Sequence, residues 1–211
     1  MKKYIYIKRM LDLIFSVILI ILLSPIMLLA AVAIKIEDPK GPVFFMQKRP
    51  GKDGKIFTLY KFRTMKVEEE KNGKPLSDME RITKVGSLLR RTSIDELPQL
   101  FNIIRGEMSF IGPRPLLVQY LKYYTPEQMR RHEVKPGISG WAQVNGRNAI
   151  SWEEKFKYDL WYVDHISFKL DLKIFWLTII NVLKGTGINN SQSDTMPLFM
   201  SSSQSVSENQ S

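Results

Sequence analysis

The longest apolar stretch of the chain covers residues 13–34, which carry no charge and are interrupted only by Ser16 and by Ser24-Pro25. As a straight α-helix this stretch would measure roughly 33 Å, which is enough to cross the hydrocarbon core of a bilayer. It is longer than the apolar region of a typical signal peptide. A membrane segment is therefore the favoured interpretation.

The residues around and within this stretch leave its topology open. Basic residues lie on both sides of it, so the positive-inside rule gives no orientation. Pro25 cannot donate a hydrogen bond to the carbonyl of Ile21, and the hydroxyl of Ser24 can satisfy the carbonyl that is freed. A helix broken at Pro25 can enter one leaflet and return to the same side. From these residues alone, re-entry and spanning are equally compatible with the sequence.

Shorter patterns after residue 36 predict a small α+β fold that is mostly helical. Residues 43–47 and 55–60 have strand character and flank a turn-rich segment, which predicts a β-hairpin. Helical patterns follow at residues 81–91, 97–104, 116–124, 127–133 and 153–165. The expected organisation is a membrane helix at 1–36, a globular domain at 37–187 and a disordered tail, rich in Ser, Gln and Asn, at 188–211.

A second apolar segment, residues 174–183, is too short to span a membrane. It contains Trp176 and is flanked by Lys169, Lys173 and Lys184. An amphipathic helix lying in the membrane interface fits this pattern, and an ordinary core helix fits it equally well.

Composition narrows the class of protein and partner. The chain has 211 residues, which suits one domain, and it contains no cysteine. This excludes a disulfide-stapled secreted scaffold, cysteine zinc sites and thiol nucleophiles. The net charge of +10 favours an anionic partner such as a membrane surface, a nucleotide or a nucleic acid, without choosing among them.

Two adjacent carboxylates, Asp95 and Glu96, follow Arg90 and Arg91 at the expected start of a helix. Neighbouring acids repel each other unless a cation lies beside them, and helix N-termini favour negative charge or a bound phosphate. The pair is a candidate site at which a metal ion and a phosphate meet an acidic nucleophile. A structural alternative is a capping box, because Ser93-x-x-Glu96 has the required spacing.

Further cations lie in separate segments of the chain. Lys61 and Arg63 occupy alternate positions of an extended segment, Arg114 lies between two prolines that stiffen its backbone, and Arg147 ends a loop rich in glycine. A nucleophilic acid, a divalent cation and dispersed positive charges are the requirements of phosphoryl transfer. The sequence therefore indicates phosphoryl chemistry beside a membrane.

The chain resembles the monotopic bacterial phosphoglycosyl transferases from residue 8 to about residue 187. Its core motifs match the family in order, and some stretches look especially like the small members that use acetamido- or diacetamido-sugar nucleotides. The motifs are Lys8-Arg9-x-x-Asp12, Ser24-Pro25, Lys61-Phe62-Arg63-Thr64-Met65, Ser93-Ile94-Asp95-Glu96-Leu97-Pro98-Gln99-Leu100-Phe101-Asn102, Gly106-Glu107-Met108-Ser109-Phe110-Ile111-Gly112-Pro113-Arg114-Pro115 and Lys135-Pro136-Gly137-Ile138-Ser139-Gly140-Trp141-Ala142-Gln143-Val144-Asn145-Gly146-Arg147.

The resemblance implies a UDP-sugar:polyprenyl-phosphate sugar-1-phosphate transferase that begins glycan or exopolysaccharide assembly. Asp95 would attack the β-phosphorus of a UDP-sugar, release UMP and hold the sugar phosphate until undecaprenyl phosphate accepts it. Mg²⁺ would assist, with Asp95 and Glu96 as its ligands. The residues expected to bind substrate or neutralise charge are Lys61, Arg63, Arg90, Arg114 and Arg147.

The resemblance also implies a re-entrant, monotopic helix at the bacterial cytoplasmic membrane, with residues 37–187 forming a catalytic domain that faces the cytoplasm. The residues that would anchor the helix are Lys8, Arg9, Asp12, Ser24 and Pro25. The alternative function is a non-enzymatic membrane scaffold of a glycan-assembly complex. No nucleic-acid partner is expected, because the chain lacks a recognisable binding motif. The motifs identify neither the sugar nor the oligomeric state.

Overall fold

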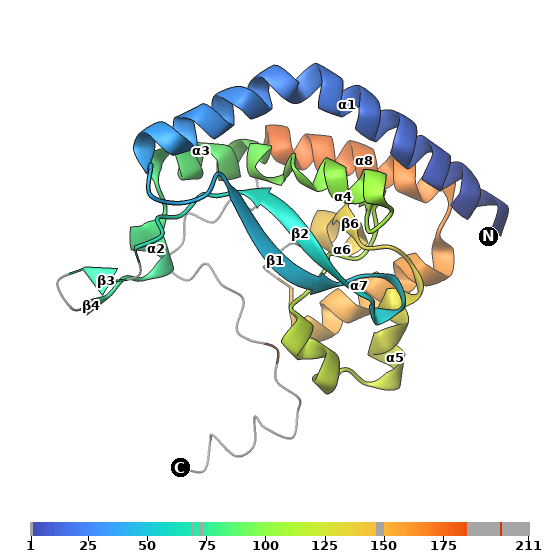
Figure 1. The fold of residues 1–211 in the computed structure, drawn as a ribbon. Coiled ribbons are helices and arrows are strands. Elements are labelled where there is room, and N and C mark those ends of the chain that lie inside the picture. Colours follow the sequence, from blue (N-terminus) through green and yellow to red (C-terminus); the bar gives the residue numbers. More distant parts are fainter. Residues whose placement is uncertain (1, 69, 72–73, 147–149, 185–198, 200–211) are drawn as a thin grey trace, which may run out of the picture. The chain divides into compact units, whose positions relative to one another are not determined.

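The computed structural model describes residues 2–68, 70–71, 74–146, 150–184 and 199 (Figure 1). The predicted class, α+β and mostly helical, is confirmed. In chain order the elements are α1 (Lys2–Glu37), β1 (Phe44–Pro50), η1 (Lys52–Gly54), β2 (Ile56–Phe62), β3 (Glu70–Lys71), β4 (Lys74–Pro75), α2 (Asp78–Arg81), α3 (Lys84–Thr92), η2 (Ile94–Glu96), α4 (Gln99–Arg105), β5 (Ser109–Ile111), η3 (Val118–Tyr123), α5 (Pro126–Met129), η4 (Arg130–Glu133), β6 (Gly137–Ser139), α6 (Trp141–Asn145), α7 (Trp152–His165) and α8 (Phe168–Leu183), where η marks a 3₁₀ helix.

The chain divides into two compact units. Unit 1 comprises residues 1–9, 48–57 and 106–211, and unit 2 comprises residues 10–47 and 58–105. The acid pair belongs to unit 2, whereas Arg114 belongs to unit 1. Each unit has its own hydrophobic core.

Helix α1 continues through Pro25 and has 36 residues, a length of about 54 Å. The Ser24 hydroxyl donates to the carbonyl oxygen of Ile21 over 2.9 Å, so the predicted replacement for the hydrogen bond lost at Pro25 is confirmed. Figure 1 shows that the helix is curved rather than straight, as expected for a helix with an internal proline.

Among the described helices, α1 is long and apolar enough to cross a membrane, judged by length and composition. Many of its large apolar side chains are exposed, including Ile21, Leu22, Leu28 and Leu29. Exposed apolar surface of this extent marks an interaction site, and its length and composition suggest that the partner is a membrane.

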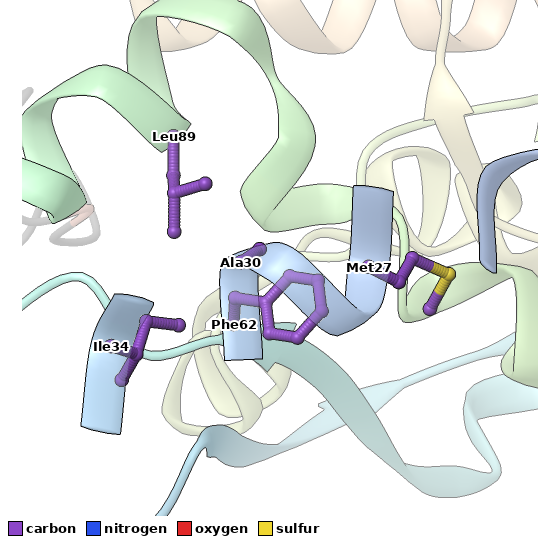
Figure 2. Packing of buried hydrophobic residues seen from close by; sticks show 5 residues of the cluster. All are labelled: Met27, Ala30, Ile34, Phe62 and Leu89. Carbon is purple, nitrogen blue, oxygen red and sulfur yellow. The ribbon is translucent and has the colours of Figure 1, made fainter. Parts of the chain in front are cut away.

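One face of α1 nevertheless lies in the core of unit 2. Figure 2 shows Met27, Ala30 and Ile34 of α1 grouped with Phe62 of β2 and Leu89 of α3. The α1 residues recur every three to four positions, which is the spacing of one helical face. The predicted membrane segment therefore also provides one side of a protein core.

The start of α3 is held from the end of α1. The side chain of Glu37 accepts hydrogen bonds from the backbone amides of Lys84 and Val85, over 2.7 and 2.8 Å. Burial raises the pKa of Glu37, but the bonds from Val85 and Lys84 outweigh this effect and leave the pKa below its usual value. These amides would otherwise be unpaired at a helix N-terminus, so Glu37 fixes where α3 begins.

Several predicted elements are confirmed and others differ. The hairpin of β1 and β2 and the helix α7 lie where the sequence predicts them. A short antiparallel pair of β3 and β4, which was not predicted from the sequence, precedes α2, and the expected helix at 116–124 is the 3₁₀ helix η3. Helix α8 begins at Phe168, earlier than predicted, because Ser167 caps it through the amide of Leu170.

The core of unit 1 joins β5, α7 and α8. It contains Ile111, Tyr162, Ile166, Leu170 and Ile174. The pair of β5 and β6 is parallel, and their backbones lie so close that a Cβ atom on Gly137 would be 2.1 Å from the amide nitrogen of Gly112. The glycines in this part of the sequence are explained by backbone packing against backbone.

Candidate active site

The acid pair lies in the single 3₁₀ turn η2, between α3 and α4. Ser93, which precedes it, has a left-handed conformation with φ of 57° and makes no side-chain cap hydrogen bond. The capping-box alternative is therefore wrong, because Ser93 precedes η2 in a left-handed conformation and its side chain caps no amide. The side chain of Asp95 is buried, with 8% of its surface exposed.

Residues of the unit 2 core flank each predicted site residue of this unit. Lys61 and Arg63 lie on either side of Phe62, and Arg90 follows Leu89 directly. Asp95 and Glu96 lie between Ile94 and Leu97, which pack against the same core. Because neighbouring residues on the chain are anchored by packing, the positions of the polar side chains are set by the core.

Lys61 and Glu96, both predicted site residues, form an ion pair. The Lys61 Nζ donates to Glu96 Oε1 over 2.8 Å, and the side chains are 21% and 17% exposed. An ion pair this sheltered is screened less than a surface pair. The contact orients the Glu96 carboxylate within the turn.

The two nearby arginines make different contacts. Arg90 is exposed and its Nε donates to Thr64 Oγ1 over 2.9 Å, which orients the guanidinium from the end of α3. Arg63 is buried, where it pairs with Asp38 and donates to the carbonyl oxygens of Pro42 and Asp38. These contacts give Arg63 a structural role at the end of β2, and its predicted contact with substrate stays a prediction.

Asn102 is the last residue of the Ser93–Asn102 motif, and the sequence predicted no role for it. Its side chain is fully buried on α4, where Oδ1 accepts from the amide of Tyr60 and Nδ2 donates to the carbonyl of Thr58. These bonds of 3.1 and 2.7 Å join α4 to β2, immediately before Lys61. A buried asparagine in an otherwise apolar helical pattern is the sequence signal that could have identified it.

In unit 1, Arg114 has an exposed side chain between the buried residues Pro113 and Pro115. Its carbonyl oxygen accepts a hydrogen bond of 2.8 Å from Nη2 of Arg131. Arg131 in turn pairs with Asp159, and both side chains are almost fully buried. A buried ion pair therefore fixes the backbone from which Arg114 extends.

Further cations lie near Arg114. Burial and the charge of Arg114 lower the pKa of Arg49 to about 10. Burial lowers the pKa of Lys155, Asp159 opposes that shift, and Arg114 and Arg131 add to it. Mutually repelling cations favour a bound anion, so this group is a candidate phosphate-binding region. The remaining predicted cation, Arg147, lies outside the described residues.

The Trp141 ring is already in contact with side chains of unit 1. It stacks on Trp161 with 5.0 Å between ring centroids, and Lys173 Nζ lies 5.1 Å from its centroid. Contacts with Trp161 and Lys173 are therefore enough to explain the position of the Trp141 ring.

The predicted anchoring residues of α1 have varied surroundings. Tyr4 and Lys8 both contact the carboxylate of Asp171 on α8, which also accepts from the Tyr162 hydroxyl. Asp12 is buried, and Arg9 lies close to the backbone of Gly106. Lys8 therefore attaches the start of α1 to α8.

The donors present suit a magnesium ion only in part. Asp95 and Glu96 offer adjacent carboxylates, the ligand type that Mg²⁺ prefers. In the part of the chain that the structure describes, no group of three or more His, Cys, Asp or Glu side chains could hold a metal. Mg²⁺ commonly binds through one or two carboxylates and completes its coordination with water and substrate phosphate, so the pair fits that mode.

Comparisons with known proteins match the sequence of this chain to a family. Residues 3–185 match the family described as bacterial sugar transferase. The sugar transferase EpsL of Bacillus subtilis (strain 168) is 55% identical over 197 residues, covering 92% of this chain and 96% of that protein.

Two other relatives have names that state a reaction. The UDP-N-acetylgalactosamine-undecaprenyl-phosphate N-acetylgalactosaminephosphotransferase of Aeromonas hydrophila is 45% identical over 193 residues, 87% of this chain and 45% of that protein. A UDP-glucose:undecaprenyl-phosphate glucose-1-phosphate transferase of Escherichia coli (strain K12) is 42% identical over 184 residues, 82% of this chain and 39% of that protein. The chain spans less than half the length of these two relatives.

Proposed function

Because this chain belongs to the bacterial sugar transferase family, we propose that it transfers a sugar 1-phosphate from a UDP-sugar to undecaprenyl phosphate and releases UMP. Relatives with 42–46% identity are named for this reaction. The observation that carries the proposal is the buried Asp95 beside Glu96, with Glu96 held by Lys61 in a rigid turn.

Asp95 is the proposed nucleophile. Its carboxylate oxygen attacks the β-phosphorus of the UDP-sugar, a bond forms from that oxygen to phosphorus, and the bond to the bridging oxygen breaks as UMP leaves. A phosphate oxygen of undecaprenyl phosphate then attacks the same phosphorus, which forms the lipid diphosphosugar and frees Asp95. One phosphoanhydride replaces another, so no ATP is required.

Other residues of unit 2 orient the acids or neutralise the charge of the substrate phosphates. Lys61 holds Glu96 over 2.8 Å, and Arg90 is oriented by Thr64 so that its exposed guanidinium can face an anion. A Mg²⁺ ion bound by Asp95 and Glu96 would neutralise phosphate charge. In unit 1, Arg114 and Arg147 are the proposed contacts to the nucleotide.

We further propose an acetamido sugar as the donor and a monotopic arrangement at the cytoplasmic membrane. The name of the Aeromonas relative supports the first proposal, because it specifies an N-acetylated sugar. The exposed apolar residues of α1 and of α8, where they include Phe175 and Trp176, support a membrane location.

A direct test measures UMP released by the purified chain from a panel of UDP-sugars with Mg²⁺, with and without undecaprenyl phosphate. Without the lipid, about one UMP per enzyme should appear, and mass spectrometry should find the sugar phosphate on Asp95. Asp95→Asn should abolish release, whereas the exposed control Asp53→Asn should not. Full activity of Asp95→Asn would refute the reaction, and a strict requirement for lipid before any UMP appears would refute the covalent intermediate. Preference for UDP-glucose would refute the acetamido donor.

Topology has a separate test, because the chain has no native cysteine. Tyr6→Cys in α1 and Lys52→Cys in η1 introduce cysteines at exposed positions. A re-entrant helix predicts that an impermeant reagent labels both positions from the cytoplasmic side. Labelling from opposite sides would show that α1 spans the membrane.

A further inference from the structure

Four aromatic side chains of unit 1 surround the ring of Phe199. Ring centroids lie 5.8 Å from Phe199 for Tyr120, 5.7 Å for Tyr124, 5.3 Å for Trp152 and 5.2 Å for Phe156. Together with Leu116 these residues form a cluster, here called the aromatic box, in which only 9% of the Phe199 surface is exposed.

The geometry of the box suits a phenylalanine. Phe199 meets Tyr120 and Phe156 at interplanar angles of 75° and 68°, which are edge-to-face contacts. Such pairs are favoured by the charge distribution of aromatic rings. The walls are themselves fixed, because Trp152 packs on Phe156 and Tyr120 packs on Trp152. The box therefore has a defined shape and a specific occupant.

The sequence around Phe199 has the composition of a short anchoring motif. Residues 196–200, Met-Pro-Leu-Phe-Met, form an apolar island within a segment that is otherwise mostly Ser, Gln and Asn. From residue 185 to the end, the chain contains no lysine or arginine and two acids, Asp194 and Glu208. A polar, slightly acidic segment cannot form a core of its own, so a single apolar cluster in it is suited to binding elsewhere.

The charges beside the box are complementary to that segment. Lys155 Nζ lies 4.6 Å from the Trp152 ring centroid, and Arg131 Cζ lies 5.9 Å from that of Phe156. Arg49 interacts electrostatically with Tyr120 and Tyr124. Arg131 is already paired with Asp159, so the positive charge that Lys155 and Arg49 place beside the box is what favours an apolar anchor carried on an acidic segment.

We propose that the aromatic box is a docking site for the chain's own C-terminal segment, with Phe199 as the anchor. The docking is intramolecular, and the buried Phe199 ring is its anchor. It extends beyond the proposed transferase reaction, which does not require this segment. The site takes a short peptide with an aromatic anchor.

The test uses the full chain with Phe199→Ala, which empties the box and leaves the rest of the protein intact. A labelled peptide of residues 192–204 is titrated into this variant and into the wild-type chain, and fluorescence anisotropy is measured. The variant should bind the peptide at least about tenfold more tightly than wild type, because the tethered segment competes at high effective concentration. A peptide carrying Phe199→Ala should bind at least about tenfold more weakly, because the buried ring is lost.

Matched controls distinguish docking in the aromatic box from non-specific binding of the peptide. In the Phe199→Ala chain, adding Trp152→Ala should remove peptide binding, whereas adding Trp176→Ala, an exposed tryptophan on α8, should not. A scrambled peptide of the same composition should not bind. Equal binding to both chains, or no binding to either, would overturn the proposal. A dimer that dissociates on Phe199→Ala would also overturn it, because the segment would then dock on a second copy.

Discussion

The buried pair of Arg131 and Asp159 provides the sharpest test of how unit 1 positions Arg114. Arg131 donates to Asp159 Oδ2 from Nε over 3.1 Å and from Nη2 over 2.7 Å, and the two side chains are 2% and 3% exposed. The same Nη2 donates to the carbonyl of Arg114. One guanidinium therefore serves both stability and the placement of a proposed nucleotide contact.

Asp159→Asn removes the negative charge and leaves a guanidinium buried without its counter-ion. Breaking a buried pair in this way costs about 3–5 kcal/mol. In a protein of this size each kcal/mol lowers the melting temperature by about 2–4 °C, so the expected fall is about 6–20 °C. The control variant Asp164→Asn, at an exposed position of the same helix, should lower the melting temperature by far less.

The double variant Arg131→Met, Asp159→Leu separates the two roles. Replacing both charges by apolar side chains is often neutral for stability, so the melting temperature should return to within a few degrees of wild type. The carbonyl of Arg114 loses its donor in this variant, so the KM for UDP-sugar should rise by about three- to tenfold.

Thermal unfolding in detergent and UMP-release kinetics measure these outcomes. If Asp159→Asn lowers the free energy of unfolding by less than about 1 kcal/mol, Arg131 and Asp159 do not form the buried ion pair described above. If the double variant recovers both stability and KM, then Arg131 does not position Arg114 and the reasoning fails.

Three further predictions follow from contacts in both units. Burial and a neighbouring arginine charge lower the pKa of His132 to about 4, below the value near 6.5 of the unfolded chain, so about 3 kcal/mol of stability present above pH 6.5 should be lost as the pH falls toward 4. His132→Asn should flatten this pH dependence of the melting temperature, and an unchanged profile would contradict the assignment. Asn102→Ala should cost about 2–4 kcal/mol and lower kcat, because two backbone groups of β2 lose their partner, and a silent variant in denaturant titration would refute this. Gly86→Ala should destabilise by about 1–3 kcal/mol, since its Cβ would lie 2.0 Å from the carbonyl oxygen of Thr64, and an unaltered melting temperature would contradict that close approach.

Local signals in the sequence predicted much of the fold. Gly106 ends α4 with φ of 83°, as a glycine after a helical pattern predicts. Strand character and turn residues predicted the hairpin of β1 and β2. The carbonyl of Ile21, which Pro25 leaves without an amide donor, accepts a hydrogen bond from Ser24, as predicted. These features depend on residues close together in the chain.

Features that depend on distant residues were not predicted. The parallel pair of β5 and β6 joins strands of three residues separated by more than twenty positions, and no periodicity marks so short a strand. The partner of Arg63 is Asp38, which lies 25 positions away.

The candidate site shows the same limit. The acid pair was found because adjacent carboxylates beside arginines are chemically conspicuous in any sequence. Asn102 was missed as a functional support, because its role exists only once α4 lies against β2. The docking of Phe199 could likewise not be predicted from the tail, although its apolar island was visible.

If α1 lies in a bilayer as proposed, the face that it contributes to the unit 2 core would make catalysis depend on bilayer thickness. Met27, Ala30 and Ile34 pack against Phe62 and Leu89, the residues adjacent to Lys61 and Arg90. A thicker or thinner membrane changes the tilt of a hydrophobic helix, and the core that α1 shares with Ile94 and Leu97 would pass such a change to the turn that carries Asp95. Lipid composition would then tune turnover in the manner of an allosteric effector, without any lipid touching the acids.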